Sequence, residues 1–501
     1  MRVTNSMMRN NSMLNMQKNK VAYNKYLMQY NTQKKIQRPS DDPIIAAKAL
    51  KYRTTLVEID QYLKNIDDAT SWMDATETVL NDVDSVLRNM VDYFTQAATG
   101  TVNSDDRADI VANLKQYSYY IYEQDANSDY AGRYLFTGYR TDVPLLFGEE
   151  QRDVTYTITE NLDVDNIKQY QYVYGGAVYD DNKTADQYAS EASKFENTHR
   201  IFLSYDDCDL TDAQGNTKSI QLTYVDQAGV TQTLNPITKN IEDNTVYNEH
   251  LHPAADEVYY IPETGELVFG DDVYNDVRTG KNLTAVYDKT EFQVNDIRPE
   301  HYFKCSTVNN KTGETGLYTN AGSQKLNYQV NFSQILAVNT EACNAIDTSI
   351  GRCIEDITNL CNEIDIMEKN LGAVEKRIAE CDENDTTKLA SLTELQEQIS
   401  TQIQLQKTVL TNALSGGITT CQKAQEKLNV ACADHGSRNN RMIMTKNKLE
   451  MQKIDTDDAK SENEDADLGE AMVNFTEADL LYQAVLGATS KILGQSLLNF
   501  I

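Results

Sequence analysis

The spacing of hydrophobic residues near the C-terminal end predicts a helix that packs against another helix. The apolar positions there follow one another in alternating steps of three and four residues: Leu468, Ala471, Phe475, Ala478, Tyr482, Val485 and Ile492, with Thr489 interrupting the series. This spacing places the side chains on one face of a helix. Lys491 is the only charged side chain after Asp479, so we expect this apolar segment to need a partner.

The N-terminal end carries a thinner apolar stripe. One residue in seven is apolar, at Met7, Leu14, Val21 and Met28. Such a stripe is too narrow to fold alone but wide enough to dock on a partner helix.

Opposite charges favour pairing of the two ends. Residues 1–40 contain eight basic and no acidic residues, whereas residues 455–501 contain ten acidic residues and two lysines. We therefore expect the ends to pair, within one molecule or between neighbours, since charge selects partner and orientation. The basic residues expected to take part are Lys18, Lys20 and Lys25, and the acidic ones Asp465 and Asp467. The alternative is two solvated tails, because charge runs alone are typical of disorder.

A long helix is predicted after the segment Arg38-Pro39-Ser40-Asp41-Asp42-Pro43. The two prolines interrupt any earlier helix, Asp42 is a good N-cap, and Pro43 suits the first helical position. One heptad position is then apolar throughout, at Ile59, Ile66, Met73, Leu80, Leu87 and Phe94. Gly100 is expected to end this helix, and a second helix is predicted over about residues 104–130.

The period changes at residues 132–138, where Tyr134 and Phe136 alternate with Leu135 and Thr137 as in a strand. From there to about residue 330 the pattern predicts a β-rich insert, sandwich-like or irregular, at the tip of a helical bundle. The expected strands are residues 154–159, 170–174, 201–205, 219–225, 258–261 and 266–269.

Helical spacing then returns as an antiparallel hairpin at about residues 346–412. Its first arm has an unbroken series of steps of four and three residues: Ile346, Ile350, Cys353, Ile357, Leu360, Ile364, Met367, Leu371, Val374, Ile378 and Cys381. The return arm is marked by Leu389, Leu392, Leu395, Ile399, Ile403 and Leu410. Ser415-Gly416-Gly417 is interpreted as a break, with helix resuming to about residue 454.

The predicted fold is mainly α with a β-rich insert, in which N- and C-terminal segments form a long helical bundle or coiled coil. We divide it into a terminal coiled-coil domain (1–39 and 456–501), a helical-bundle domain (40–140 and 331–455) and a β-rich variable domain (141–330).

Composition excludes several functions. A net charge of −30 over 501 residues argues against nucleic-acid binding. No stretch is apolar enough to cross a membrane, and the N-terminus lacks the apolar core of a secretory signal peptide. The eight cysteines form no Cys-x-x-Cys pair and are interpreted as packing thiols.

Catalytic and cofactor motifs are also missing from the sequence, so we predict a protein without enzymatic activity, cofactor or metal. His250 and His252 beside Glu249 lack further ligands and precede Pro253, which favours an ordinary loop. Asp271-Asp272 lacks the spacing of a calcium loop.

Several motifs together resemble the flagellar hook-associated protein 3 family, flagellin-like proteins at the hook–filament junction. They are the opening MRVTNSMM, residues 38–43 with 46–50, residues 61–66, residues 132–138, residues 435–441 (HGSRNNR) and the ending Leu497-Leu498-Asn499-Phe500-Ile501. The resemblance covers roughly residues 1–145 and 430–501. The hairpin at 346–412 and the cysteines depart from the usual pattern of the family.

The resemblance implies a structural adaptor exported unfolded by the flagellar type III route, without a cleavable signal, and located outside the cell in the flagellum. The implied partners are further copies in a ring, hook-associated protein 1 on the hook side, flagellin and an export chaperone. The residues expected to serve assembly are Met7, Leu14, Val21, Met28, Arg38, Pro39, Ser40, Asp41, Asp42, Pro43, Leu468, Phe475, Tyr482, Val485, Ile492, Leu497, Leu498 and Phe500.

Two alternatives remain open at this point. One is a flagellin, the filament subunit itself. The other is a coiled-coil adhesion or signalling protein, for which a folded monomer with ordered ends is expected. The junction interpretation instead predicts ends that are disordered in the monomer and fold on assembly.

Overall fold

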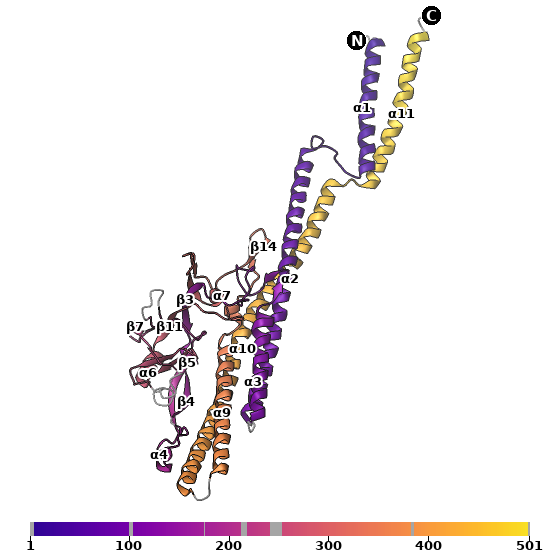
Figure 1. The fold of residues 1–501 in the computed structure, drawn as a ribbon. Helices are drawn as coiled ribbons and strands as arrows, with labels where there is room; N and C mark the ends of the chain where they lie inside the picture. Colours follow the sequence, from indigo (N-terminus) through magenta and orange to yellow (C-terminus); the bar gives the residue numbers. More distant parts are fainter. Residues whose placement is uncertain are drawn as a thin grey trace. The chain divides into compact units, whose positions relative to one another are not determined.

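The computed structural model describes residues 5–99, 104–174, 176–211, 218–240, 253–381 and 385–498. The fold is mainly α, with long terminal helices and a central β-rich insert, as the sequence predicts (Figure 1). The main helices are α1 (Asn5–Thr32), α2 (Pro43–Thr99), α3 (Ser104–Ser118), the π-helix η1 (Tyr119–Ala126), α9 (Ser349–Glu380), α10 (Thr386–Glu464) and α11 (Leu468–Leu498).

Strands and short helices occupy the region between η1 and α9. The strands are β1 (Asp129–Tyr130), β2 (Arg133–Tyr134), β3 (Val154–Leu162), β4 (Lys168–Tyr174), β5 (Lys194–Phe202), β6 (Gln221–Val225), β7 (Thr231–Leu234), β8 (Ile237–Thr238), β9 (Val258–Ile261), β10 (Glu266–Phe269), β11 (Lys281–Lys289), β12 (Lys304–Asn309), β13 (Thr315–Tyr318), β14 (Asn327–Asn331) and β15 (Gln334–Ala337). The short helices are η2 (Val164–Asn166), α4 (Ala185–Ser190), α6 (Asp271–Thr279), α7 (Pro299–Tyr302) and α8 (Ala342–Ala345).

The chain separates into two compact units. The first contains residues 1–69, 328–336 and 440–501, and the second contains residues 70–327 and 337–439. Helices α2 and α10 contribute to both units. The second unit contains the β-rich insert together with the helices that it packs against, and the three-domain division expected from the sequence stays a prediction.

Two sheets face each other in the second unit. The strand orders are β4-β5-β10-β9-β8 and β13-β12-β3-β11-β6-β7, and all pairings are antiparallel except β8 with β9. Both sheets contribute to one buried core, for example Ile158 and Tyr287 from one and Leu267 and Phe269 from the other. The insert is therefore a sandwich, with the inward-facing residues of both sheets meeting in its centre.

Several predicted strands need correction. The strand expected at residues 201–205 is β5, which begins at Lys194 and ends at Phe202. The strand expected at residues 132–138 is only the two-residue β2, paired with β1 through a turn at Ala131 and Gly132. Both turn residues have positive φ, 53° and 77°, as tight hairpins of this type require. Leu135, Phe136 and Thr137 are all buried, so this segment is enclosed without being a strand.

The predicted helical hairpin is present, formed by α9 and the first part of α10. Ile350, Ile357, Leu360 and Ile364 of α9 are buried, as are Leu392, Leu395, Ile399 and Ile403 of α10. Side chains also join the arms, since Gln406 Nε2 donates to Glu363 Oε2 at 2.7 Å. The sheet containing β4 and β5 packs along this hairpin, where Arg200 of β5 pairs with Asp356 of α9 and Lys168 of β4 donates to Thr420 of α10.

The predicted break at residues 415–417 is wrong. Helix α10 runs without interruption through Gly416 and Gly417 and ends at Glu464 rather than near residue 454. A Cβ atom at Gly417 would lie 3.0 Å from Cε1 and Cζ of Phe94, which is closer than side-chain carbons normally approach. Glycine at this position therefore permits close packing of α10 on α2; it does not end the helix.

The segment that leaves the insert is fixed by the HGSRNNR motif on α10. Arg438 donates to the carbonyl oxygens of Asn339 at 2.7 Å and Ala337 at 3.3 Å, and to Thr340 Oγ1 at 3.0 Å. His435 is buried, with Nε2 3.0 Å from the Met73 carbonyl oxygen of α2. These contacts hold the returning chain against α2 and α10.

We predict that Arg438→Met lowers the free energy of unfolding of the second unit by about 1–3 kcal/mol, because it leaves buried carbonyl groups without donors. Urea unfolding measures this loss, with hydrogen exchange at residues 337–340 as the readout. The matched control is Arg441→Met, since Arg441 is exposed on the same helix. Equal stability of the two variants would contradict the assigned role.

Candidate assembly surface

Helices α1 and α11 lie side by side and antiparallel (Figure 1). Aromatic rings join them: the Tyr23 ring centroid is 5.4 Å from that of Phe475 and 5.6 Å from that of Tyr482. The Tyr30 and Phe475 rings are 6.0 Å apart and nearly parallel. The expected pairing of the two ends therefore occurs within one molecule.

The contacting face of α11 is the one that the sequence predicts. Ala471, Ala478 and Thr489 are buried, and Phe475, Tyr482 and Val485 are half-buried. Thr489 thus continues the series that it was expected to interrupt. Leu468 is exposed. The side chains of Ile492, Leu497 and Leu498, and the whole of Phe500, lie outside the described residues.

The contacting face of α1 is a different one from the predicted stripe. The half-buried positions are Ser12, Met16, Asn19, Ala22, Tyr23, Tyr26, Leu27 and Gln29. Met7, Leu14, Val21 and Met28 are between 51% and 69% exposed. The spacing of Met16, Tyr23, Tyr26 and Tyr30 could have revealed the correct face, but Ser12 and Asn19 hide it among polar residues.

The segment between α1 and α2 is joined to the segment between α10 and α11 by a short antiparallel bridge. Lys34 pairs with Asp465 in this bridge. The Lys35 backbone N–H donates to the Glu464 carbonyl at 2.7 Å, and the Ala466 N–H donates to the Gln33 carbonyl at 2.9 Å. The Lys34 ammonium also forms an ion pair with the Asp465 carboxylate. We call residues 33–35 and 464–466 the clasp.

Arg53 of α2 completes the clasp. Its Nε and one terminal nitrogen donate to the two Glu464 carboxylate oxygens at 2.9 and 2.7 Å, while Lys34 lies 3.4 Å from the same carboxylate. The Glu464 side chain is only 4% exposed. The hydrogen bonds from Arg53 are the main reason that the pKa of Glu464 lies below its ordinary value.

The segment from Arg38 to Pro43 forms a turn that starts α2, as predicted. Asp42 Oδ1 accepts from the Ile44 and Ile45 N–H groups at 3.0 and 3.1 Å, which caps the helix. Asp41 Oδ2 accepts from the Arg38 and Gln37 N–H groups at 2.9 and 3.1 Å. Both aspartates therefore have structural roles in the single chain.

The expected ion pairs of Lys18, Lys20 and Lys25 with Asp465 and Asp467 are not formed. All three lysines are exposed, and none makes an ion pair within the described part of the chain. Asp465 instead bonds Lys34, because the clasp brings these two residues together. The charge of α1 is therefore left uncompensated by α11.

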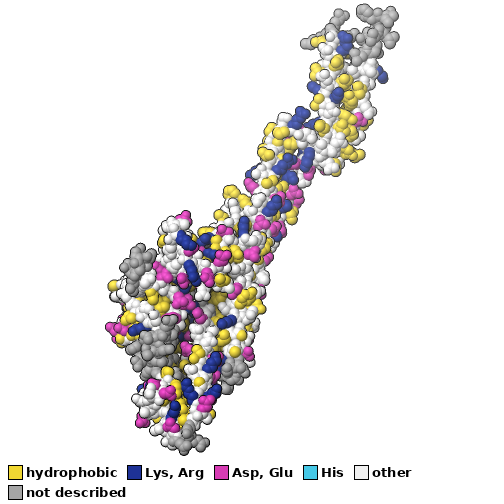
Figure 2. Space-filling model, viewed as in Figure 1, with side chains coloured by type: hydrophobic (Ala, Val, Ile, Leu, Met, Phe, Trp, Pro, Cys, Tyr) yellow, Lys and Arg dark blue, Asp and Glu magenta, His cyan; other side chains and the backbone are white. Residues whose placement is uncertain are grey.

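An uncovered apolar surface remains on the helix pair. On α11 it contains Met472, Val473, Leu480, Leu481 and Leu486, which are 41–64% exposed. On α1 it contains the predicted stripe. Figure 2 shows hydrophobic side chains next to Lys and Arg on this part of the molecule. Contiguous apolar surface of this kind marks sites of association.

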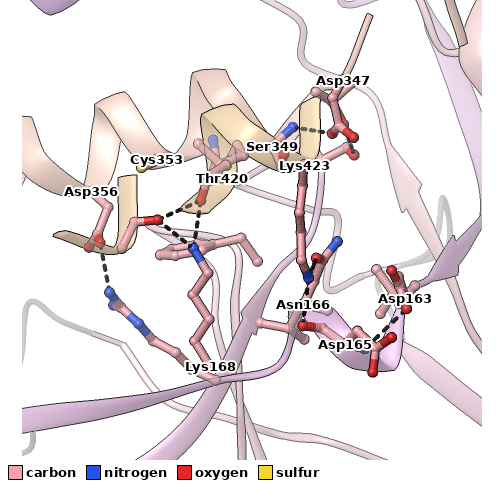
Figure 3. Close-up of a pocket in the computed structure, with 18 of the residues that line it drawn as sticks. Asp163, Asp165, Asn166, Lys168, Asp347, Ser349, Cys353, Asp356, Thr420 and Lys423 are labelled. Atoms are coloured by element: carbon pink, nitrogen blue, oxygen red, sulfur yellow. Dashed lines mark hydrogen bonds and ion pairs between the residues drawn. The ribbon is translucent and has the colours of Figure 1, made fainter. Parts of the chain in front are cut away.

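A cleft of about 1080 Å³ lies between the sheet containing β4 and β5 and the α9–α10 hairpin (Figure 3). Lys168 of β4 crosses it and donates to Thr420 Oγ1 at 2.6 Å and to the Gly416 carbonyl at 3.3 Å. Lys423 of α10 reaches back to Asn166 Oδ1 at 2.7 Å. Lys168 and Lys423 thus hold the sheet on the helices, and the cleft is a polar docking seam.

A buried ionic cluster closes one side of this seam. The Arg200 guanidinium forms ion pairs with Glu266 and with Asp356 of α9, the latter at 2.7 Å, and lies over the Tyr170 ring at 3.3 Å. Nearby, burial raises the pKa of Glu363 to about 7. The neighbouring carboxylates of Asp356 and Glu266 add to this rise, while the hydrogen bond from Gln406 opposes it.

The cysteines are free thiols with packing roles. Burial raises the pKa of Cys208, Cys305 and Cys421 to about 12, which keeps them protonated. No cluster of metal-binding side chains occurs among the described residues. His250 and His252 lie outside them. In the described part of the chain, no helix has the length and hydrophobicity needed to span a membrane.

Residues 3–141 match the model of the bacterial flagellin N-terminal helical region, and residues 418–501 match that of the C-terminal helical region. The chain is thus similar to bacterial flagellin at both ends. The N-terminal match contains α1, α2, α3 and η1, and the C-terminal match contains the second half of α10 and α11. These matches confirm the flagellin-like character that the sequence predicts for both ends.

Two curated relatives are similar to the chain. Flagellar hook-associated protein 3 of Escherichia coli (strain K12) is 30% identical over 151 residues, which are 30% of this chain and 47% of that protein. Flagellar hook-associated protein 3 of Salmonella typhimurium is 29% identical over 142 residues, 28% of this chain and 45% of that protein. The chain thus spans about half the length of these relatives.

A solved structure of a putative flagellar hook-associated protein from Vibrio parahaemolyticus aligns with 85% of this chain and all of that one, at 13% identity and a TM-score of 0.34.

Removing the Glu464 charge should loosen the clasp. Glu464→Gln is expected to destabilise it by about 0.5–1 kcal/mol at neutral pH, because Arg53 is partly exposed and loses an ionic partner. Hydrogen exchange at residues 33–35 and in α1 measures the effect. Folding lowers the pKa of Glu464 from its ordinary value of 4.5. The greater stability of the wild-type clasp is therefore present above pH 4.5 and is lost as the pH falls through the lowered pKa. Asp457→Asn, which removes an exposed acid of α10, should leave this exchange unchanged.

Glu363 should make the docking seam sensitive to pH. The raised pKa of Glu363 means that its ionised form lowers the stability of the folded state. This destabilisation is absent below pH 4.5, the ordinary pKa, grows as the pH rises to about 7, and stays constant at higher pH. We expect Glu363→Gln to stabilise the second unit by on the order of 1–3 kcal/mol at pH 8 and to have little effect at pH 4.5. Thermal unfolding at both pH values tests this, with exposed Glu380→Gln as control. A gain that does not vary with pH would exclude the titration.

Proposed function

We propose that this protein is a structural component of the bacterial flagellum, an adaptor at the junction between hook and filament. The observation that carries the proposal is the α1–α11 pair. Its two helices lie within the segments that match the flagellin helical regions, it is joined by the clasp, and it leaves apolar surface uncovered on both helices. A helix pair of this kind gains stability when neighbouring subunits cover that surface.

The residues proposed to make these intersubunit contacts include the exposed stripe Met7, Leu14, Val21 and Met28. Leu468 is proposed for the same role on α11. Phe475, Tyr482 and Val485 act indirectly, by holding α11 against α1. The turn at residues 38–43 positions α2 relative to the clasp.

The proposed partners are further copies of the chain in a ring, hook-associated protein 1, flagellin and an export chaperone. The proposed location is extracellular, after export without a cleavable signal peptide. We further propose that the protein is not an enzyme and has neither nucleic acid nor membrane as a partner. The names of the relatives, both hook-associated proteins, support a structural role.

The alternative is a flagellin that forms the filament itself. The flagellin helical regions fit both functions, whereas the similarity to hook-associated protein 3 favours the adaptor. A coiled-coil adhesion or signalling protein is less well supported, because that function would not explain why the chain matches both flagellin helical regions.

Deleting the gene from its natural host separates the alternatives. Loss of an adaptor should leave hooks without filaments and release flagellin into the medium, as seen by electron microscopy and by blotting the culture supernatant. Restoring the wild-type gene should restore filaments. Filaments that persist on the deletion strain would refute the adaptor, and hooks without flagellin in the medium would favour the filament subunit.

A further inference from the structure

The outward face of α1 combines apolar and basic residues in one regular stripe. Leu14, Lys18, Val21, Lys25 and Met28 follow one another in steps of four, three, four and three residues, and all are exposed. The spacing is that of a helix–helix contact, and it lies on the side of α1 away from Tyr23 and its partners on α11. A helix that covers this stripe must bring carboxylates to the two lysines.

The last turns of α10 carry a stripe of matching spacing and opposite charge. Met451, Asp455, Asp458 and Glu462 follow in steps of four, three and four residues, and all four are exposed. None of these acids, and neither Lys18 nor Lys25, forms an ion pair within the described residues. In Figure 2, acidic side chains are visible on the stretch of the molecule where α2 and α10 run.

We propose that α1 of one copy docks on the end of α10 in a second copy, with Lys18 and Lys25 opposite Asp455, Asp458 and Glu462. Two α1 stripes would repel each other, so the contact joins unlike surfaces. Contacts between unlike surfaces repeat from copy to copy and close into a ring when the rotation permits. This inference rests on the proposed assembly and names the surfaces that make it.

Charge reversal in two separate variants tests the contact. The first variant is Lys18→Glu with Lys25→Glu, and the second is Asp458→Lys with Glu462→Lys, both in the full chain. Each is produced alone in the deletion strain, and the two are then produced together. The readout is the fraction of the protein retained on purified hooks and not shed into the medium.

Each variant alone should lose retention by at least about tenfold, because like charges then face each other across every contact. Producing both together should restore retention to within about twofold of wild type, since each reversed stripe then meets its complement in the other variant. The matched control is Arg9→Glu with Lys20→Glu, which changes the charge of α1 equally on another side of the helix.

A second measurement detects the contact directly. A carbodiimide joins a lysine amine to a carboxylate only where the two are adjacent. In hook-bound protein from mixed isotope-labelled and unlabelled copies, the expected product links Lys18 or Lys25 of one copy to residues 455–462 of another. Circular dichroism of each variant shows whether the helices still form.

Single variants that are retained normally would overturn the contact and leave the adaptor function standing. Loss of retention that joint production does not repair would also overturn it, and would assign the stripes to a different partner. If wild-type protein is itself absent from hooks, the proposed function fails as well, and the two failures are thereby distinguished.

Discussion

The architecture depends on a contact between residues more than 400 positions apart in the sequence, the clasp. Two backbone hydrogen bonds and the Lys34–Asp465 ion pair join the connectors, and Arg53 fixes the Glu464 carboxylate beside them. Once the connectors are joined, α1 lies against α11, and α2 runs beside α10 with opposite direction, as the contacts of Ile45 with Asn463 and of Asp60 with Lys453 show. The entropy of closing so long a loop grows only slowly with its length, so a few well-placed bonds suffice when apolar packing follows.

Helical packing was largely predictable from the sequence, because a heptad records which residues face inward. The seams of α2, α9 and α11 and the Asp42 cap all follow from spacing alone. The face of α1 did not, since its inward side mixes Tyr23 and Tyr26 with Asn19, while its regular apolar stripe points to solvent. The predicted break at Gly417 was wrong for another reason: glycine is common in loops, but here its lack of a side chain leaves room for the Phe94 ring. Neither the clasp nor the strand pairings could be predicted, because they join residues whose local sequence carries no record of the partner.

The β-rich insert is attached differently from the way the helices pack on one another. Lys168, Lys423 and Arg200 hold its sheet to the α9–α10 hairpin across a cleft, through polar atoms. A polar interface costs more free energy to dehydrate than an apolar one, and its formation therefore gives a smaller net stabilisation. The added hairpin thus provides a platform for the insert, and its heptads stabilise the platform independently of what rests on it.

Burial of the thiols affects how readily the cysteines of each molecule are oxidised. Disulfide exchange needs the thiolate, and a thiol with a pKa of about 12, such as Cys208, is ionised roughly a thousandfold less than an ordinary one. The unfolded chain has no such protection. Wherever the chain meets an oxidant, oxidation therefore competes with folding: a copy that folds promptly stays reduced, whereas one that folds late can be trapped by covalent bonds absent from the native state.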